Sequence, residues 1–175
     1  MSVAVLLIDP KYPHNVGQVL RACAAYNVPS LLFTGQHMQD NLRALKCLPR
    51  EERLRGYQTI SLTHAERPFD LLPELTPVAV EVRRNSESLP MFEHRKNAVY
   101  VFGPEDGSIG SGVLSQCHRF VAIPSVHCLN LSMAVGTVLY DRQSKLDPSH
   151  PLDMTSVDNP GYFEVRDFLR PSNPD

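Results

Sequence analysis

The stretch VAVLLIDPKYPHNVGQVLRACAAYNVPSLLFT, residues 3–34, decides the fold. It opens with an apolar, β-branched run from Val3 to Ile8, which is typical of a strand buried on both faces of a sheet. Apolar residues then recur with helical spacing and form one stripe on a helix that ends near Asn27. The stripe consists of Val16, Val19, Leu20, Cys23 and Ala24. A second apolar run, Leu31 to Thr34, completes a strand, helix, strand unit of the kind that builds parallel sheets.

Polar side chains stand at the head of this otherwise apolar helix. Asn15 occupies the expected N-cap position, and Gln18, three residues later, is placed as its capping-box partner. Arg21 lies off the apolar stripe. Because helical side chains lean towards the N-terminus of their helix, its guanidinium can reach back towards the loop that precedes the helix.

Short apolar runs with the same strand character recur along the rest of the chain. They lie at Val78 to Val82, Val99 to Gly103 and Phe120 to Ile123, with helical patterns between some of them. Strands that alternate with helices predict an α/β domain with a doubly wound, mostly parallel sheet covered on both faces. Ligands bind beyond the carboxyl ends of the strands in such sheets, so we expect the loops after three strands to share one site. These loops are Asp9 to His14, Gly103 to Gly112 and Pro124 to Leu129.

The overall composition fits one globular domain, with 175 residues and a formal net charge of −2. A near-neutral chain does not coat nucleic acid through bulk charge, although basic clusters lie between Arg43 and Arg55 and at Arg83 and Arg84. The simpler interpretation of these clusters is a solvated surface. The N-terminal apolar run is too short for a signal peptide and lacks a basic lead, and no later run reaches the roughly 18 apolar residues of a membrane span. We therefore expect a soluble, cytoplasmic protein that does not contact membranes.

The four cysteines sit in apolar, periodic segments rather than in the turn-rich spacing of a disulfide scaffold. They are Cys23, Cys47, Cys117 and Cys128, and we expect reduced thiols. Cys117 and Cys128 each neighbour a histidine, but the sequence has no C-x-x-C pair, and ordinary packing is the simpler interpretation. The sequence therefore predicts no metal site.

The last predicted helix is apolar on two faces. One stripe consists of Leu131, Val135, Val138 and Leu139, and the other of Met133, Thr137 and Tyr140. A helix of this kind needs two partners, and we expect one to be its own sheet and the other a second subunit of a homodimer. Beyond Arg142 the composition changes to scattered Pro, Asp and Ser, which is typical of a loosely held segment. The sequence thus predicts a domain over residues 1–143 and a Pro-rich tail over residues 144–175.

A glycine-rich loop, FGPEDGSIGSG at residues 102–112, follows one of the predicted strands. Its spacing matches neither a Walker A loop nor the G-x-G-x-x-G of dinucleotide enzymes, which argues against a nicotinamide dehydrogenase. Glu105 and Asp106 would also repel a phosphate anion. Carboxylates at this place suit a cationic or hydroxyl-bearing ligand, and a plain turn with solvated acids is the alternative.

Three segments of the sequence carry a family resemblance when they are taken in order. They are NVGQVLRA at residues 15–22, VFGPEDGSIG at 101–110 and AIPSVHCLNLSMAV at 122–135, in which Asn130 alone would be an ordinary N-cap. Together they resemble the three motifs of the SPOUT RNA methyltransferases, in particular the TrmH-like group that methylates ribose 2'-hydroxyls. The resemblance runs from about Val3 to Arg142. It implies an S-adenosylmethionine-dependent enzyme that acts on RNA as a homodimer, with a deep trefoil knot in the C-terminal part of its α/β domain.

The resemblance also implies site residues by motif position. Catalytic roles fall to Asn15, Arg21, Glu105 and Asn130, and cofactor contacts, largely through the backbone, to Val80, Gly103, Ile123, Cys128 and Leu129. Cys128 stands where many relatives have Ser. A guanidinium scarcely deprotonates in proteins because its pKa is above roughly 12. We therefore interpret Arg21 as a cation that stabilises a developing alkoxide or fixes a neighbouring phosphate.

Two alternatives remain open: a related enzyme that methylates a base nitrogen, and an RNA-binding homologue without catalysis, of which the change at Cys128 would be a sign. Arg21 after Asn15 favours ribose chemistry. Because the sequence shows no appended RNA-binding domain, we expect the catalytic dimer itself to hold the RNA, through basic residues such as Arg83 and Arg84 and those between Arg43 and Arg55. A small enzyme of this kind favours tRNA over ribosomal RNA as its substrate.

Overall fold

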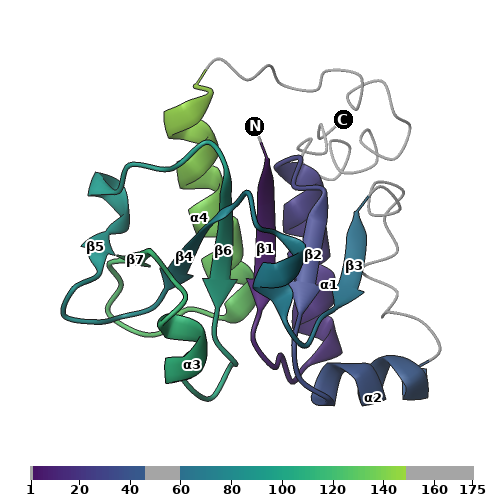
Figure 1. Cartoon of the computed structure of the whole chain (residues 1–175). Coiled ribbons are helices and arrows are strands. Elements are labelled where there is room, and N and C mark those ends of the chain that lie inside the picture. The colour runs from purple at the N-terminus through teal and green to yellow at the C-terminus, as the bar shows by residue number, and fades with distance from the viewer. Residues whose placement is uncertain (1, 46–59, 149–175) are drawn as a thin grey trace, which may run out of the picture.

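A seven-stranded sheet in which all neighbouring strands are parallel forms the centre of the molecule. The computed structural model describes residues 2–45 and 60–148, and Figure 1 shows the strand order β3-β2-β1-β6-β4-β7-β5. The strands are β1 (Val3–Leu7), β2 (Ser30–Phe33), β3 (Ser61–His64), β4 (Thr76–Val80), β5 (Glu87–Ser88), β6 (Ala98–Phe102) and β7 (Arg119–Ala122). The predicted α/β class with a mostly parallel sheet is confirmed.

The two central strands, β1 and β6, owe their position to their apolar and aromatic sequences. Every residue of both strands is buried, because each strand has a neighbour on either side and a covered face above and below. Val5 pairs with Tyr100 and Leu6 with Val101. Since successive side chains alternate between the faces, the first pair enters one core cluster and the second pair enters the other.

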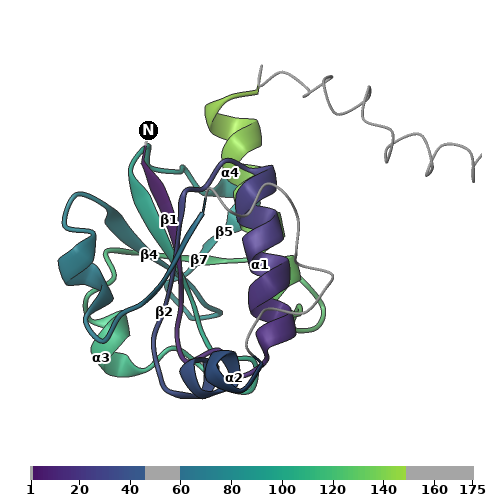
Figure 2. The ribbon, with the colours of Figure 1, turned by 90° about the vertical axis from the view of Figure 1, so that its right-hand side faces the viewer.

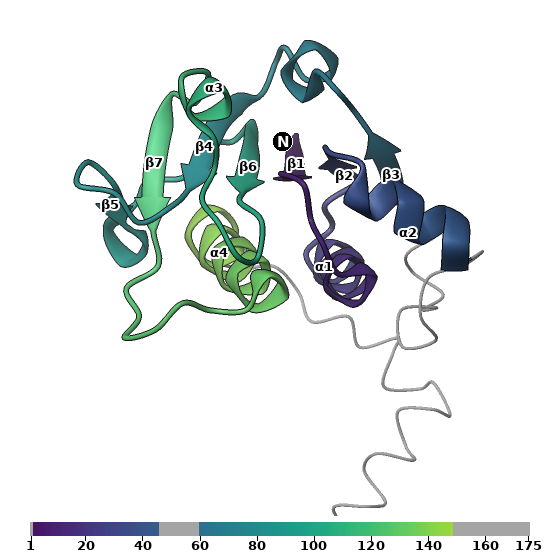
Figure 3. The ribbon, with the colours of Figure 1, turned by 90° about the horizontal axis from the view of Figure 1, so that it is seen from below.

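Helices cover both faces of the sheet. They are α1 (Pro13–Ala25), α2 (His37–Leu45), α3 (Ser111–Leu114) and α4 (Leu131–Leu146), with short 3₁₀ helices η3 (Pro68–Leu71) and η4 (Leu89–Met91). Figures 2 and 3 show α1 and α4 side by side on one face, with α3 on the other. Because α1 follows β1 and α4 follows β7, the loops that lead into both helices arrive at the same edge of the sheet.

The head of α1 differs from the prediction. The helix begins at Pro13, Tyr12 takes the N-cap position without a side-chain hydrogen bond, and Asn15 lies within the first turn. Proline is tolerated there because its missing N–H has no helical partner in the first turn, so the helix starts earlier than the polar signal of Asn15 suggests. The N-cap prediction for Asn15 is wrong. The same prediction for Asn130 is confirmed, since its side chain accepts a hydrogen bond from the Ser132 backbone N–H at 2.9 Å.

The predicted strands agree with the structure to within two residues at each end. The sequence patterns did not identify β3, β5 or α2. Helix α4 continues to Leu146, beyond the predicted boundary at residue 143, and the predicted tail from residue 149 onwards lies outside the described residues, as do residues 46–59 of the basic cluster. None of the helices in residues 2–45 and 60–148 has the length and apolarity that a bilayer crossing needs.

Candidate active site

A cavity of about 720 Å³ opens where β4, β6 and β7 end and where α1 and α4 begin. This volume is common for small-molecule sites. Residues of all three loops that we expected to share a site line it. The predicted site residues among them are Asn15, Val80, Gly103, Glu105, Ile123, Cys128, Leu129 and Asn130.

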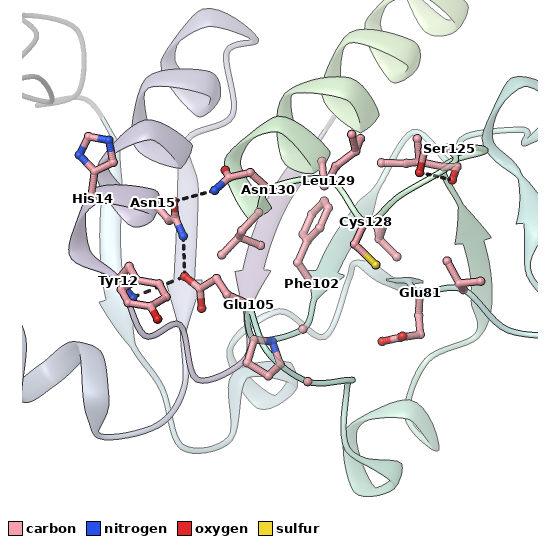
Figure 4. A pocket seen from close by; sticks show the side chains of 18 residues that line it. Tyr12, His14, Asn15, Glu81, Phe102, Glu105, Ser125, Cys128, Leu129 and Asn130 are labelled. Atoms are coloured by element: carbon pink, nitrogen blue, oxygen red, sulfur yellow. Dashed lines mark hydrogen bonds between the residues drawn. The ribbon is translucent and has the colours of Figure 1, made fainter.

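Three side chains from three distant segments meet at one wall of the cavity (Figure 4). Asn15 Nδ2 donates to Glu105 Oε1 at 2.8 Å, and Asn130 Nδ2 donates to Asn15 Oδ1 at 3.0 Å. Asn15 is only 7% exposed, so both ends of its amide find their partners inside the protein. Because one end of an amide donates and the other accepts, these contacts fix the orientation of Asn15 between its two neighbours.

Backbone groups of the loop after β1 hold Glu105 from another side. The N–H of Lys11 donates to Oε2 at 3.0 Å and the N–H of Tyr12 donates to Oε1 at 3.4 Å. The next residue, Asp106, does not line the cavity and pairs instead with the Lys11 side chain. This hydrogen bond lowers the pKa of Asp106 and raises the pKa of Lys11. Of the two acids in the glycine-rich loop, one therefore faces the cavity and the other faces the surface.

Hydrogen bonds continue from Asn130 along the seam between α1 and α4. Ser132 Oγ lies 2.7 Å from Asn130 Oδ1 and 2.6 Å from Gln18 Oε1, and its single proton is donated to one of them at a time. Gln18 Nε2 lies 2.7 Å from Nε2 of His14, which stands at the edge of the cavity. We call Glu105, Asn15, Asn130, Ser132, Gln18 and His14 the polar chain.

Sequence reasoning found only part of the polar chain. It placed Gln18 as a capping-box partner, which is wrong because the Gln18 side chain bonds to His14 and Ser132. His14 and Ser132 fell within the segments that the sequence singled out, but neither was assigned a role. The i, i+4 spacing of His14 and Gln18 on one face of a helix is the signal that could have revealed their contact.

Another part of the cavity wall is apolar. Val80, Phe102, Ile123 and Leu129 line it, from strand ends and from the loop before α4. Gly103 at the end of β6 lets the glycine-rich loop fold back, because a Cβ there would stand only 3.2 Å from the backbone nitrogen of Ile109. Apolar side chains beside loop backbone groups suit a flat heterocycle with polar edges.

A second carboxylate, which sequence reasoning missed, lines the cavity at Glu81, directly after β4. Its Oε2 accepts the backbone N–H of Ile109 at 3.0 Å. The predicted strand ran to Val82, so Glu81 fell inside it. A single acid in the otherwise uncharged run PVAVEV, residues 77–82, is the signal that could have revealed this residue.

The cavity is acidic. Glu81 and Glu105 line it, and within residues 2–45 and 60–148 no Lys or Arg does. Coulomb attraction in such a partly enclosed site favours a cationic ligand, and carboxylates also accept hydrogen bonds from hydroxyl groups. This is the ligand chemistry that the glycine-rich loop predicts.

Arg21 is the one predicted site residue that does not line the cavity. It lies exposed on α1, nearly two turns after Asn15, which is roughly 9 Å along the helix axis. Cys128 is exposed and lines the cavity. It brings a thiol to the position where Ser would bring a hydroxyl. The catalytic and cofactor roles assigned to all of these residues remain predictions.

Known proteins resemble this chain in sequence and in fold. The curated tRNA (cytidine-2'-O-)-methyltransferase TrmJ of Methanocaldococcus jannaschii is 26% identical over 161 residues, covering 83% of this chain and 69% of that protein. A structure reported for the 2-OH methylation of C/U34 on tRNA superposes with a TM-score of 0.67 at 24% identity, covering 84% of this chain and 97% of that one.

The AdoMet-bound rRNA methyltransferase of Sinorhizobium meliloti has the same fold, with a TM-score of 0.63 at 18% identity over 83% of this chain. This chain spans only 57% of the length of that enzyme. The profile of the SpoU rRNA Methylase family matches residues 2–140. Since that match covers most of the sequence, and the predicted family resemblance is thereby confirmed, the chain belongs to the SpoU rRNA Methylase family.

Proposed function

We propose that this chain is an S-adenosylmethionine-dependent RNA methyltransferase that methylates a ribose 2'-hydroxyl of tRNA. The observation that carries the proposal is the contact of Asn15, Glu105 and Asn130, from three distant segments, at the wall of an acidic cavity. Family membership supports the reaction class. The relative TrmJ, a tRNA 2'-O-methyltransferase, supports both the ribose acceptor and tRNA.

The cavity fits S-adenosylmethionine in size, charge and donor groups. That cofactor carries a sulfonium and an ammonium cation, which suit a cavity with Glu81 and Glu105 and no Lys or Arg among the described lining residues. We propose that it is held beside the apolar wall, largely through backbone groups, by Val80, Gly103, Ile123, Cys128 and Leu129. When bound, the cofactor supplies an activated methyl group at its sulfonium.

The residues of the polar chain contribute by positioning. Glu105 has hydrogen-bond donors on both carboxylate oxygens, so its side chain has little freedom to rotate. Asn15 is clamped between Glu105 and Asn130, and Asn130 also caps α4. A wall of this rigidity orients a ribose hydroxyl, and orientation of the reacting groups lowers the barrier to a transfer reaction.

We propose that Arg21 contributes a fixed positive charge, to the developing alkoxide or to a phosphate beside it. Arg21→Lys keeps the charge and removes the planar fork of donors. We expect methyl transfer to fall by about tenfold or more, the loss of one charge-assisted hydrogen bond, with unchanged thermal unfolding. Activity equal to that of the wild type would exclude any role for Arg21 that needs the fork.

The same proposal includes the oligomeric state, the knot and the location that the family resemblance implies. A homodimer is supported by the exposed face of α4, where Met133 and Tyr140 are 61% and 63% exposed while Val135 and Leu139 on the other side are buried. The family resemblance supports a trefoil knot within the domain of residues 1–143. We also propose a cytoplasmic location, in keeping with tRNA as the substrate.

Transfer of labelled methyl from S-adenosylmethionine to purified tRNA and to purified rRNA, followed by nucleoside analysis, tests the proposal. We expect a 2'-O-methylnucleoside in tRNA. Label on a base would favour the base-methylating alternative, and label in rRNA alone would contradict the choice of tRNA. No label in either pool, with intact cofactor binding, would favour the RNA-binding homologue, and Cys128→Ser would then show whether a hydroxyl restores transfer.

A further inference from the structure

Glu81 stands at the end of the cavity that the polar chain does not reach. Its backbone is fixed, because its N–H donates to the Val121 carbonyl at 3.0 Å and its own carbonyl accepts the Ser86 hydroxyl at 2.6 Å. One carboxylate oxygen, Oε2, is fixed as well by the N–H of Ile109 at 3.0 Å. The side chain is therefore held in one place without help from a ligand.

The other carboxylate oxygen of Glu81, Oε1, has no donor or cation within the part of the chain that the structure describes. Figure 4 shows the carboxylate pointing into the cavity, across from Glu105. The two acids differ in this respect, because both oxygens of Glu105 already accept hydrogen bonds from the protein. A carboxylate that is half-removed from water and has an open acceptor is suited to a ligand that brings its own donors.

Glu81 and Gly103 flank the same piece of loop. The backbone nitrogen of Ile109 is the atom that Glu81 binds, and it is also the atom that a Cβ at Gly103 would approach to 3.2 Å. Val80, Val82 and Ile123 line the cavity beside them. A ligand at this end therefore meets apolar side chains, a bare glycine backbone and one open carboxylate oxygen.

We infer that Glu81 is a cofactor-binding residue whose Oε1 accepts hydrogen bonds from the ribose hydroxyls of the adenosine part of S-adenosylmethionine. The inference rests on the proposed function. The adenine 6-amino group and the ammonium group are the competing donors on that cofactor. A 6-amino donor would leave the response to Glu81→Gln unchanged in a 2'-deoxy analogue, and the ammonium shares a carbon atom with the α-carboxylate. Placing the ammonium at Glu81 would bring a like charge close to the glutamate, whereas a diol brings no anion.

Calorimetric binding of two ligands to the purified chain tests the inference. S-adenosylhomocysteine contains the diol and the amino-acid group, whereas 5'-methylthioadenosine contains the diol alone, and neither carries a sulfonium charge. Glu81→Gln keeps the size of the side chain and an oxygen for the Ile109 N–H, so the cavity keeps its shape. Glu74→Gln, at an exposed position before β4, is the matched control.

We expect Glu81→Gln to weaken the binding of both ligands by about tenfold, the loss of one hydrogen bond to a charged group, and Glu74→Gln to change neither. A 2'-deoxy analogue of 5'-methylthioadenosine should bind the wild type about tenfold more weakly and should not respond to Glu81→Gln. Weakening of S-adenosylhomocysteine alone would overturn the inference in favour of the ammonium group. Equal binding by wild type and Glu81→Gln would overturn it outright, while failure of the wild type to bind either ligand would contradict the proposed function itself.

Discussion

The two ends of α4 carry the same kind of polar chemistry in different surroundings. At its start, Asn130 and Ser132 join the helix to α1 and, through Asn15, to Glu105. Near its end, Asp141 accepts from His94 Nε2 at 2.7 Å and from Lys145 Nζ at 2.7 Å. Both sets of contacts tie α4 to the rest of the fold, but only the first set opens on a cavity.

The cluster near the end of α4 consists of His94, Tyr100, Asp141 and Lys145, and the two rings at its centre are closed to ligands. The His94 side chain is 0% exposed, and its Nδ1 lies 2.6 Å from the Tyr100 hydroxyl. Because a carboxylate only accepts, the Nε2–H of neutral His94 donates to Asp141, and Nδ1 accepts the Tyr100 proton. Every polar group of the ring is therefore used within the protein, and what remains for this cluster is to hold the fold.

The difference between the two ends shows what separates a functional polar network from a structural one: whether a ligand can reach it. Hydrogen-bonded polar side chains, a carboxylate among them, occur at both ends of the helix. Beside the cavity their alignment can act on a ligand, whereas at the closed end it acts on stability alone. Each of the following substitutions tests whether activity and stability divide along this line.

The largest effect should come from Glu105→Gln. Glu105 accepts hydrogen bonds from the Lys11 N–H and from Asn15 Nδ2 on its two oxygens. A glutamine must turn its own amide N–H towards one of these two donors, so one of the contacts that fix this wall is lost. We expect methyl transfer to tRNA to fall by about 100-fold while the cooperative unfolding transition remains. Steady-state kinetics at saturating cofactor measures the loss. Wild-type rates in this variant would show that the polar chain is only a packing device.

His94→Ala should show the opposite pattern. Removal of the ring takes away the His94 partner of the Tyr100 hydroxyl and leaves the Asp141 carboxylate with Lys145 alone, and we expect the free energy of unfolding to fall by about 2–3 kcal/mol. Below the unfolding transition, kcat per folded molecule should stay near the wild-type value. Urea unfolding and kinetics on the same preparation separate the two quantities, and a loss of kcat without a loss of stability would contradict the assignment.

The closed cluster should also respond to pH. Burial lowers the pKa of His94 below its usual value of about 6.5, although Asp141 opposes the shift. The folded protein therefore resists taking up a proton that the unfolded chain accepts, so stability present above pH 6.5 is lost as the pH falls towards the folded pKa. Unfolding curves should show this decline in the wild type and a weaker one in His94→Gln. Parallel curves for the two proteins would exclude His94 as the source.

The smallest effect should come from Asp106→Asn, the neighbour and matched control of Glu105→Gln. Asp106 pairs with Lys11 at the surface and does not line the cavity. Exposed ion pairs contribute little, so we expect methyl transfer and thermal unfolding to match the wild type within error. Were Asp106→Asn to lose as much activity as Glu105→Gln, the distinction between the two acids would be wrong.

The sequence specified the central unit of the fold because local patterns were sufficient there. Apolar runs at residues 3–8 and 31–34 and one helical stripe need no long-range information to be recognised. The edge strand β3 was missed because three of the four residues of SLTH are polar and because the strand is exposed at alternate positions. Asn15 was misplaced as a cap because Pro13 offered the helix an earlier start.

The sequence predicted which residues belong to the site better than it predicted which of them bond to each other. The family resemblance named Asn15, Glu105 and Asn130, but the residues in contact are 90 and 115 positions apart, so which side chains bond to each other depends on the folded backbone. Glu81 was not predicted as a site residue because the predicted strand included it. The Glu81 carboxylate can accept the Ile109 N–H only after the glycine-rich loop has folded back to present it.

The measurement that tests the central claim most directly compares wild type and Asn15→Ala for transfer of labelled methyl to tRNA, with nucleoside analysis and thermal unfolding of both proteins. Asn15 joins the other two motif segments through its amide alone. The account predicts a 2'-O-methylnucleoside from the wild type and a yield lower by about 100-fold from Asn15→Ala at a similar unfolding temperature. Equal yields from the two folded proteins, or methyl on a base in either, would contradict it.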